Sequence, residues 1–168
     1  MRPIRLTMQA FGPYVNEQVL EFDRLGETGI YAIIGETGAG KTTIFDAIVF
    51  ALYGTGSGED RGKGQTLRSL SASPNQETCV KLEFVSRGRP YSIVRRPKQQ
   101  LAKLRGEGLR DVAASQTLTL PDGTVLTAEA DISDKIEKDI LDKFEIQLMD
   151  GVTDALSRVL IPDQTEAA

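Results

Sequence analysis

The eight residues from Gly35 to Thr42 constrain the fold of this chain more than any other part of its sequence. They read G-E-T-G-A-G-K-T and match the spacing G-x-x-x-x-G-K-[ST] at every fixed position. A continuous apolar run, residues 30–34, precedes them, and residues 44–52 are apolar nearly all round. The run at residues 30–34 is typical of a strand buried on both faces. The segment at residues 44–52 is typical of a buried helix. The sequence therefore predicts a strand, a glycine-rich loop and a helix at the centre of an α/β core.

The loop has the chemistry of a Walker A phosphate-binding site. Its glycines allow the backbone N–H groups from about Gly38 to Thr43 to turn inward as an anion-binding nest, at the positive end of the following helix. Lys41 can reach the β- and γ-phosphates of ATP, and the Thr42 hydroxyl can ligate Mg²⁺. A glycine-rich turn without a ligand is the alternative. The site we expect consists of Gly35, Thr37, Gly38, Ala39, Gly40, Lys41, Thr42 and Thr43, with Lys41 as the catalytic cation and Thr42 as the metal ligand.

Alternating apolar and polar residues on both sides of this unit predict three antiparallel hairpins. The first covers residues 3–22, with a turn at Phe11-Gly12-Pro13-Tyr14. The second joins residues 80–84 to 91–93, and the third turns at Pro121-Asp122-Gly123. Hairpins on both sides of a strand–loop–helix unit favour a mixed sheet.

The remaining segments carry weaker signals. Gly54 is placed to end the central helix in the left-handed conformation, and residues 54–64 hold five glycines, which predicts a mobile loop. Residues 97–114 are polar, basic and irregular. Isoleucines 132, 136 and 140 and Phe144 recur every four residues, which predicts a helix capped by Asp131 or Ser133, its acidic face turned to solvent rather than to a metal. Residues 154–161 suggest a short helix, so we expect one domain over 1–161 and a frayed tail over 162–168.

Composition excludes several kinds of chemistry. The chain has no histidine, so imidazole bases and His-ligated zinc are excluded. Its one cysteine, Cys79, excludes an internal disulfide and is expected to be a small core residue. With no apolar stretch of about 18 residues and no signal-peptide pattern, we expect a protein of the reducing cytoplasm.

Charge is uneven along the chain. Residues 87–110 carry eight bases against one acid, Glu107, and this segment is our candidate for a surface that faces DNA phosphates or an acidic partner. A solvated hairpin and loop is the alternative. The bases are Arg87, Arg89, Arg95, Arg96, Lys98, Lys103, Arg105 and Arg110.

Several motifs outside the loop resemble the SbcC family, the ATPase subunits of a bacterial double-strand-break repair nuclease. The resemblance covers about residues 1–130. Its motifs are Arg2–Leu6, Phe11–Tyr14, Glu21–Asp23, Gly35–Ile48, Phe50–Gly54, Leu67–Ser69, Val80–Phe84, Gly88–Tyr91, Arg95–Pro97 and Arg105–Gly108.

The resemblance implies the N-terminal lobe of an ABC-type ATPase head, in the P-loop NTPase class. In that family both ends of a much longer chain form the head, and a long coiled coil lies between them. Two heads, as a homodimer, enclose ATP and drive a partner nuclease, an SbcD-like protein, on double-stranded DNA ends. Arg87, Arg89, Arg95 and Arg96 are the residues we expect to face that DNA.

The chain also departs from the family. The match fades after about Glu137, and Gln147 does not stand in the family's glutamine motif. The apolar run ending in Asp-Glu, the Leu-Ser-Gly-Gly signature and the switch histidine are not found. We therefore expect an N-terminal lobe, which hydrolyses ATP only when completed. The alternatives are a nucleotide-binding remnant without turnover and a small P-loop phosphotransferase in which Arg95 or Arg96 clamps a phosphate.

Overall fold

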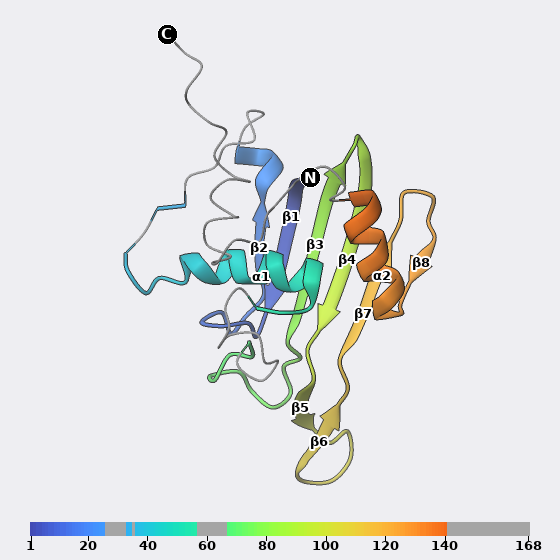
Figure 1. Cartoon of the computed structure of the whole chain (residues 1–168). Coiled ribbons are helices and arrows are strands. Elements are labelled where there is room, and N and C mark those ends of the chain that lie inside the picture. The colour runs from blue at the N-terminus through green and yellow to red at the C-terminus, as the bar shows by residue number, and fades with distance from the viewer. Residues whose placement is uncertain (26–32, 35, 57–66, 141–168) are drawn as a thin grey trace.

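A six-stranded sheet is the main feature of the computed structural model, which describes residues 1–25, 33–34, 36–56 and 67–140 (Figure 1). The strand order is β2-β1-β3-β4-β7-β8, and each pairing between these strands is antiparallel. The strands are β1 (Arg2–Gln9), β2 (Gln18–Glu21), β3 (Cys79–Ser86), β4 (Arg89–Arg96), β7 (Ser115–Thr119) and β8 (Val125–Leu126).

The alternation of the sequence explains the sheet. In β3, Val80, Leu82 and Phe84 are at most 1% exposed, whereas the residues between them are half-buried. Leu6 of β1 lies opposite Leu82 on one side and Leu20 of β2 on the other, so apolar side chains of three strands share one face. The three predicted hairpins, β1–β2, β3–β4 and β7–β8, are confirmed.

Helix α1 (Lys41–Tyr53) crosses this apolar face (Figure 1) and contacts β3 and β4. Eight of its 13 residues are buried, which confirms the predicted buried helix. Gly54 ends it in the left-handed conformation, with φ of 73°, and donates its N–H to the Phe50 carbonyl at 2.8 Å. A short 3-10 helix, η1 (Phe22–Leu25), follows β2.

A second helical segment covers the sheet beside β7. It consists of α2 (Glu129–Lys135), followed by one π-helical turn, η3 (Ile136–Ile140). Ile132, Ile136 and Ile140 are buried in the same core as α1, which confirms the four-residue repeat as far as residue 140. The N-cap is Ala128 and not Asp131 or Ser133, because the helix begins before both of them.

The segment 97–114, expected to be irregular, contains a two-stranded ribbon, β5 (Gln99–Ala102) and β6 (Leu109–Val112). It extends from one end of the β4–β7 pair (Figure 1). Hydrophobic alternation did not reveal it because one of the inward side chains of β5 is Gln99, which is 4% exposed and hydrogen-bonded to Thr78.

The apolar run 30–34 is only partly described. Ile33 packs against the core, but Ile34 lies in no strand and is 92% exposed, so the expected double-sided burial is wrong at this residue. A residue buried on both faces needs a layer on each side, and the described part of the chain supplies none over Ile34. Residues 30–32, 57–64, 144 and 154–168, on which other predictions rest, lie outside the described residues.

Candidate functional site

The glycine-rich loop leads directly into α1. Gly38 and Gly40 have φ of 88° and 84°, left-handed values that glycine adopts without strain. Among the residues that the structure describes, a Cβ on Gly38 would meet nothing within 4 Å, so this part of the chain leaves the space beside Gly38 open. A Cβ on Gly40 would lie 2.9 Å from Pro13 Cγ and from Tyr14 Oη, so the other side of the loop is closely packed.

The N-terminus of α1 has the form of an anion site. Its N-cap is Gly40, which has no side chain to cap the first-turn amides. The nest differs in detail from the prediction, because two of its amides have backbone acceptors. Ala39 N–H donates to the Glu36 carbonyl at 3.2 Å, and Thr43 N–H donates to the Gly40 carbonyl at 3.0 Å. These bonds shape the loop, and the positive end of the helix remains aimed at its open side.

The two polar side chains of the motif lie at this helix start. Lys41 is half-buried, and its Nζ donates to the Glu36 carbonyl at 2.5 Å, so the ammonium lies over the loop. Thr42 is exposed, and Thr43 is half-buried against Gly12. The other residues of the expected site, Thr37, Gly38 and Ala39, are exposed along the loop, and Gly35 lies outside the described residues.

The Phe11–Tyr14 turn packs behind the loop, a contact that the sequence did not predict. Tyr14 Oη donates to the Gly40 carbonyl at 3.3 Å. Gly12 has φ of 54°, and a Cβ there would lie 2.6 Å from Thr43 Cγ2. The only signal in the sequence was the Phe-Gly-Pro-Tyr turn itself, about 20 residues before the loop.

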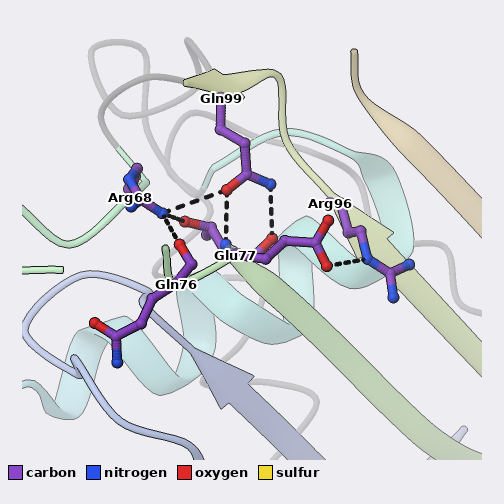
Figure 2. Close-up of polar contacts among 6 residues, drawn as sticks. Arg68, Gln76, Glu77, Arg96 and Gln99 are labelled. Carbon is purple, nitrogen blue, oxygen red and sulfur yellow. Dashed lines mark hydrogen bonds and ion pairs between the residues drawn. The ribbon is translucent and has the colours of Figure 1, made fainter. Parts of the chain in front are cut away.

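An arginine-centred network fixes the segment next to this turn (Figure 2). Arg68 donates from Nη1 to the Gln76 carbonyl at 2.6 Å, to Thr78 Oγ1 at 2.9 Å and to Gln99 Oε1 at 3.3 Å. Its Nη2 donates to the Ser73 carbonyl at 2.8 Å. Four acceptors occupy this guanidinium, which therefore joins the start of β3 to the base of the β5–β6 ribbon.

Arg95 has a different role from the one expected. Its side chain is 4% exposed and donates to the Ala51 and Leu52 carbonyls at 2.7 and 3.0 Å, at the C-terminal end of α1. It also pairs with Glu129 at 2.5 Å. A cation at this end complements the helix dipole. Arg95 is therefore a buried helix cap, and its assignment to a DNA-facing surface was wrong.

The other bases of the 87–110 segment lie in separate places. Arg96 donates to Glu77 Oε2 at 2.9 Å (Figure 2), a hydrogen bond that raises the pKa of the guanidinium. Arg87 and Arg89 are exposed at the β3–β4 turn, at the opposite end of β4 from the ribbon (Figure 1). A strand of eight residues spans about 25 Å, so these bases do not form one patch.

Three further points concern Cys79, metal binding and membrane spans. Cys79 is half-buried at the start of β3, where burial raises the pKa of its thiol, so it is less enclosed than a core residue. Among the residues that the structure describes, no group of three or more acidic or cysteine side chains could hold a metal ion. In the same residues no helix is long and apolar enough to cross a membrane.

Comparison with known proteins identifies the family. The profile of the AAA domain family matches residues 5–158. The SbcC polypeptide of the nuclease SbcCD from Vibrio cholerae is 42% identical over 130 residues, and that from Lactococcus lactis is 44% identical over 108 residues. These alignments cover 76% and 64% of this chain but 13% and 10% of the relatives.

A solved structure, the SMC head domain from Thermotoga maritima, matches 80% of this chain and 42% of its own, with 22% identity and a TM-score of 0.46. The family match agrees with the α/β P-loop class and with the SbcC resemblance of the sequence motifs, and confirms both. The chain belongs to the AAA domain family, and its similarity is to a short part of the much longer SbcC proteins.

Proposed function

We propose that this chain binds Mg-ATP as the N-terminal half of an ABC-type ATPase head. The observation that carries the proposal is the geometry at the start of α1. An uncapped helix N-terminus, two left-handed glycines and the Lys41 ammonium lie together where the loop enters α1. This arrangement suits a polyphosphate, because amides and a cation all face the same negative charge.

Each residue of the site has a proposed part in binding. Lys41 would exchange its bond to the Glu36 carbonyl for phosphate oxygens, and the exposed Thr42 hydroxyl would meet the metal. Gly38 leaves room for the phosphates, since its Cβ position is open. Bound Mg²⁺ would neutralise phosphate charge. Gly35, Thr37, Ala39 and Thr43 complete the proposed contact set.

The wider function rests on the relatives' name. We propose that, in the cytoplasm, two heads enclose ATP and drive an SbcD-like nuclease on double-stranded DNA ends. The chain covers 13% of its Vibrio cholerae relative, so hydrolysis would need the rest of a head. We further propose that residues 1–161 form one lobe. A phosphotransferase is disfavoured, because Arg95, one of its two candidate clamps, is committed to the far end of α1.

Calorimetric titration of the 168-residue chain tests the proposal. We expect Mg-ATP, Mg-ADP and tripolyphosphate to bind at one site, because the loop contacts phosphates. Adenosine, the control without phosphates, is expected not to bind. Steady hydrolysis of ATP should stay at the buffer rate. Tight binding of adenosine, or turnover by the chain alone, would contradict the proposal. If adding an SbcC C-terminal half in trans gives binding but no turnover, the nucleotide-binding remnant is the better interpretation.

A DNA contact is proposed for Arg87 and Arg89, because both are exposed at the β3–β4 turn whereas Arg95 is buried. In the full-length protein, the double variant R87E/R89E should weaken binding to duplex DNA and lower the salt slope by about one per lost phosphate contact. The matched control, K103E/R105E, reverses two charges of the loop that joins β5 and β6. An equal or larger loss in the control would move the contact to that loop.

A further inference from the structure

Tyr14 lies close to the phosphate-binding loop without belonging to the motif. Its hydroxyl donates to the Gly40 carbonyl at 3.3 Å, although 26 residues separate the two. The same carbonyl accepts the first hydrogen bond of α1, from Thr43 N–H at 3.0 Å. The Gly40 carbonyl therefore has two donors, one inside the helix and one from the Phe11–Tyr14 turn.

We infer that Tyr14 is a positioning residue for the phosphate-binding loop, an inference that rests on the proposed nucleotide site. The Gly40 carbonyl and the Lys41 N–H belong to one planar trans peptide and point in opposite directions. A hydroxyl that holds the carbonyl on the side of the turn therefore directs the Lys41 N–H away from it, toward the open side of the loop. Tyr14 thus acts on bound phosphate through the orientation of this peptide.

The turn itself is rigid enough to fix that hydroxyl. Phe11 and Tyr14 exchange two backbone hydrogen bonds, both 2.9 Å long. The ring of Phe11 is 1% exposed and lies 5.8 Å from the ring of Phe50 in α1. The turn is thereby held to the same helix whose N-terminus it supports.

A second attachment holds the turn from behind. Gly12 N–H donates to the Leu67 carbonyl at 2.9 Å, and Ser69 N–H donates to the Ala10 carbonyl at 2.8 Å. Arg68 lies between Leu67 and Ser69, and its guanidinium is bound to four acceptors, three of which Figure 2 shows. Contacts therefore run without a gap from the arginine network through the turn to Gly40.

Close packing leaves the turn little freedom to move away from the loop. A Cβ on Gly12 would lie 2.6 Å from Thr43 Cγ2, and one on Gly40 would lie 2.9 Å from both Pro13 and Tyr14. Both glycines have left-handed φ values as well. The turn and the loop each have a glycine where they meet, Gly12 in the turn and Gly40 in the loop. This close approach lets the Tyr14 hydroxyl reach the Gly40 carbonyl directly.

The test compares Y14F with Y53F. Phenylalanine at position 14 removes the hydroxyl and keeps the ring. We expect the affinity for Mg-ATP and for tripolyphosphate to fall by the same factor, about three- to tenfold, as for one lost hydrogen bond. Tyr53 lies at the other end of α1 and is 41% exposed, so Y53F should bind as the unsubstituted chain does.

A spectroscopic readout separates positioning from a general loss of stability. In the nucleotide-free protein, the ¹H–¹⁵N resonance of the Lys41 amide should shift in Y14F and stay in place in Y53F. The melting temperature of Y14F should remain within about 3 °C of the unsubstituted chain. Unchanged affinity for both ligands, or an unmoved Lys41 resonance, would overturn the inference.

The proposed function can fail independently of this inference. If K41A binds Mg-ATP as well as the unsubstituted chain does, nucleotide does not bind at this loop. If K41A loses binding while Y14F keeps it, the loop binds nucleotide and Tyr14 does not position it. A drop in affinity that is confined to ATP and spares tripolyphosphate would also count against Tyr14, since the Lys41 amide can act only on phosphate.

Discussion

Replacing Lys41 by alanine is expected to lower the affinity for Mg-ATP by about 100-fold or more, because two charge-assisted bonds to phosphate contribute about 1.5–3 kcal/mol each. The stability of the nucleotide-free chain should hardly change. There the ammonium makes a hydrogen bond to the Glu36 carbonyl at an exposed site, and exposed bonds of this kind contribute little. Titration calorimetry gives the affinity, and thermal unfolding followed by circular dichroism gives the stability.

The matched control for this substitution is K103A. Lys103 is an exposed lysine beside the β5–β6 ribbon, far along the chain from the loop. Its loss removes the same charge from the chain, so any effect of net charge alone would appear in both variants. An affinity that falls equally in K41A and K103A would mean that ATP is attracted by general charge and not by the loop.

Replacing Arg95 by methionine is expected to destabilise the chain by about 3 kcal/mol, since removal of one partner from a buried ionic network leaves the other groups unsatisfied. The buried carbonyls of Ala51 and Leu52 would lose their donor, and Glu129 would lose its partner. For a chain of this size the melting temperature should fall by roughly 6–12 °C. Chemical denaturation gives the free energy directly.

The neighbouring residue supplies the control for Arg95. Arg96 pairs with Glu77, but both side chains are more than a third exposed, so R96M should change the free energy of unfolding by less than about 1 kcal/mol. The two variants make the same chemical change one residue apart on β4. Equal and small losses in both would mean that water replaces the Arg95 guanidinium at the end of α1.

Local periodicity was enough to predict most of the sheet and both helical segments. The apolar residues Val80, Leu82 and Phe84 alternate with polar ones, which predicts a strand, because side chains two residues apart in a strand lie on the same face of the sheet. The buried character of α1 and its end at Gly54 also follow from residues that are neighbours in sequence. Hence the elements and their hairpin partners could be predicted without any knowledge of tertiary contacts.

The errors arise where a polar residue is satisfied by a distant partner. Gln99 faces inward because Thr78 and Arg68 form hydrogen bonds with its amide, and Arg95 is buried because carbonyls of α1 accept hydrogen bonds from its guanidinium. Neither set of partners can be predicted from the neighbouring sequence. Gln99 therefore interrupted the apolar pattern of its strand, and Arg95 resembled a base on the surface. The predicted N-cap of α2 was wrong for a related reason, because the helix begins earlier, at Glu129, which pairs with Arg95.

The candidate site divides in the same way. The motif itself predicted glycines that let the loop backbone turn and the placement of Lys41 at a helix start, because their spacing is dictated by the loop. The support from Tyr14 was not predictable, since a bond across 26 residues depends on how the first hairpin packs against α1. The exposure of Ile34 was not predicted, because an apolar run indicates that burial is favourable but does not show that another part of the chain covers it.

The position of β1 between β2 and β3 has a consequence for the order of events during synthesis. Residues of β1 pair with residues of β2 that lie less than about 20 positions further along the chain. Pairing of β1 with β3, in contrast, joins Met8 to Val80. Closing so long a segment is costly in chain entropy and slow. As the ribosome releases the chain, α1 therefore emerges before the strands on which it packs, and its apolar side chains stay uncovered until β3 and β4 follow. The strands that cover α1, the helix that follows the glycine-rich loop, are complete only after Arg96 has emerged.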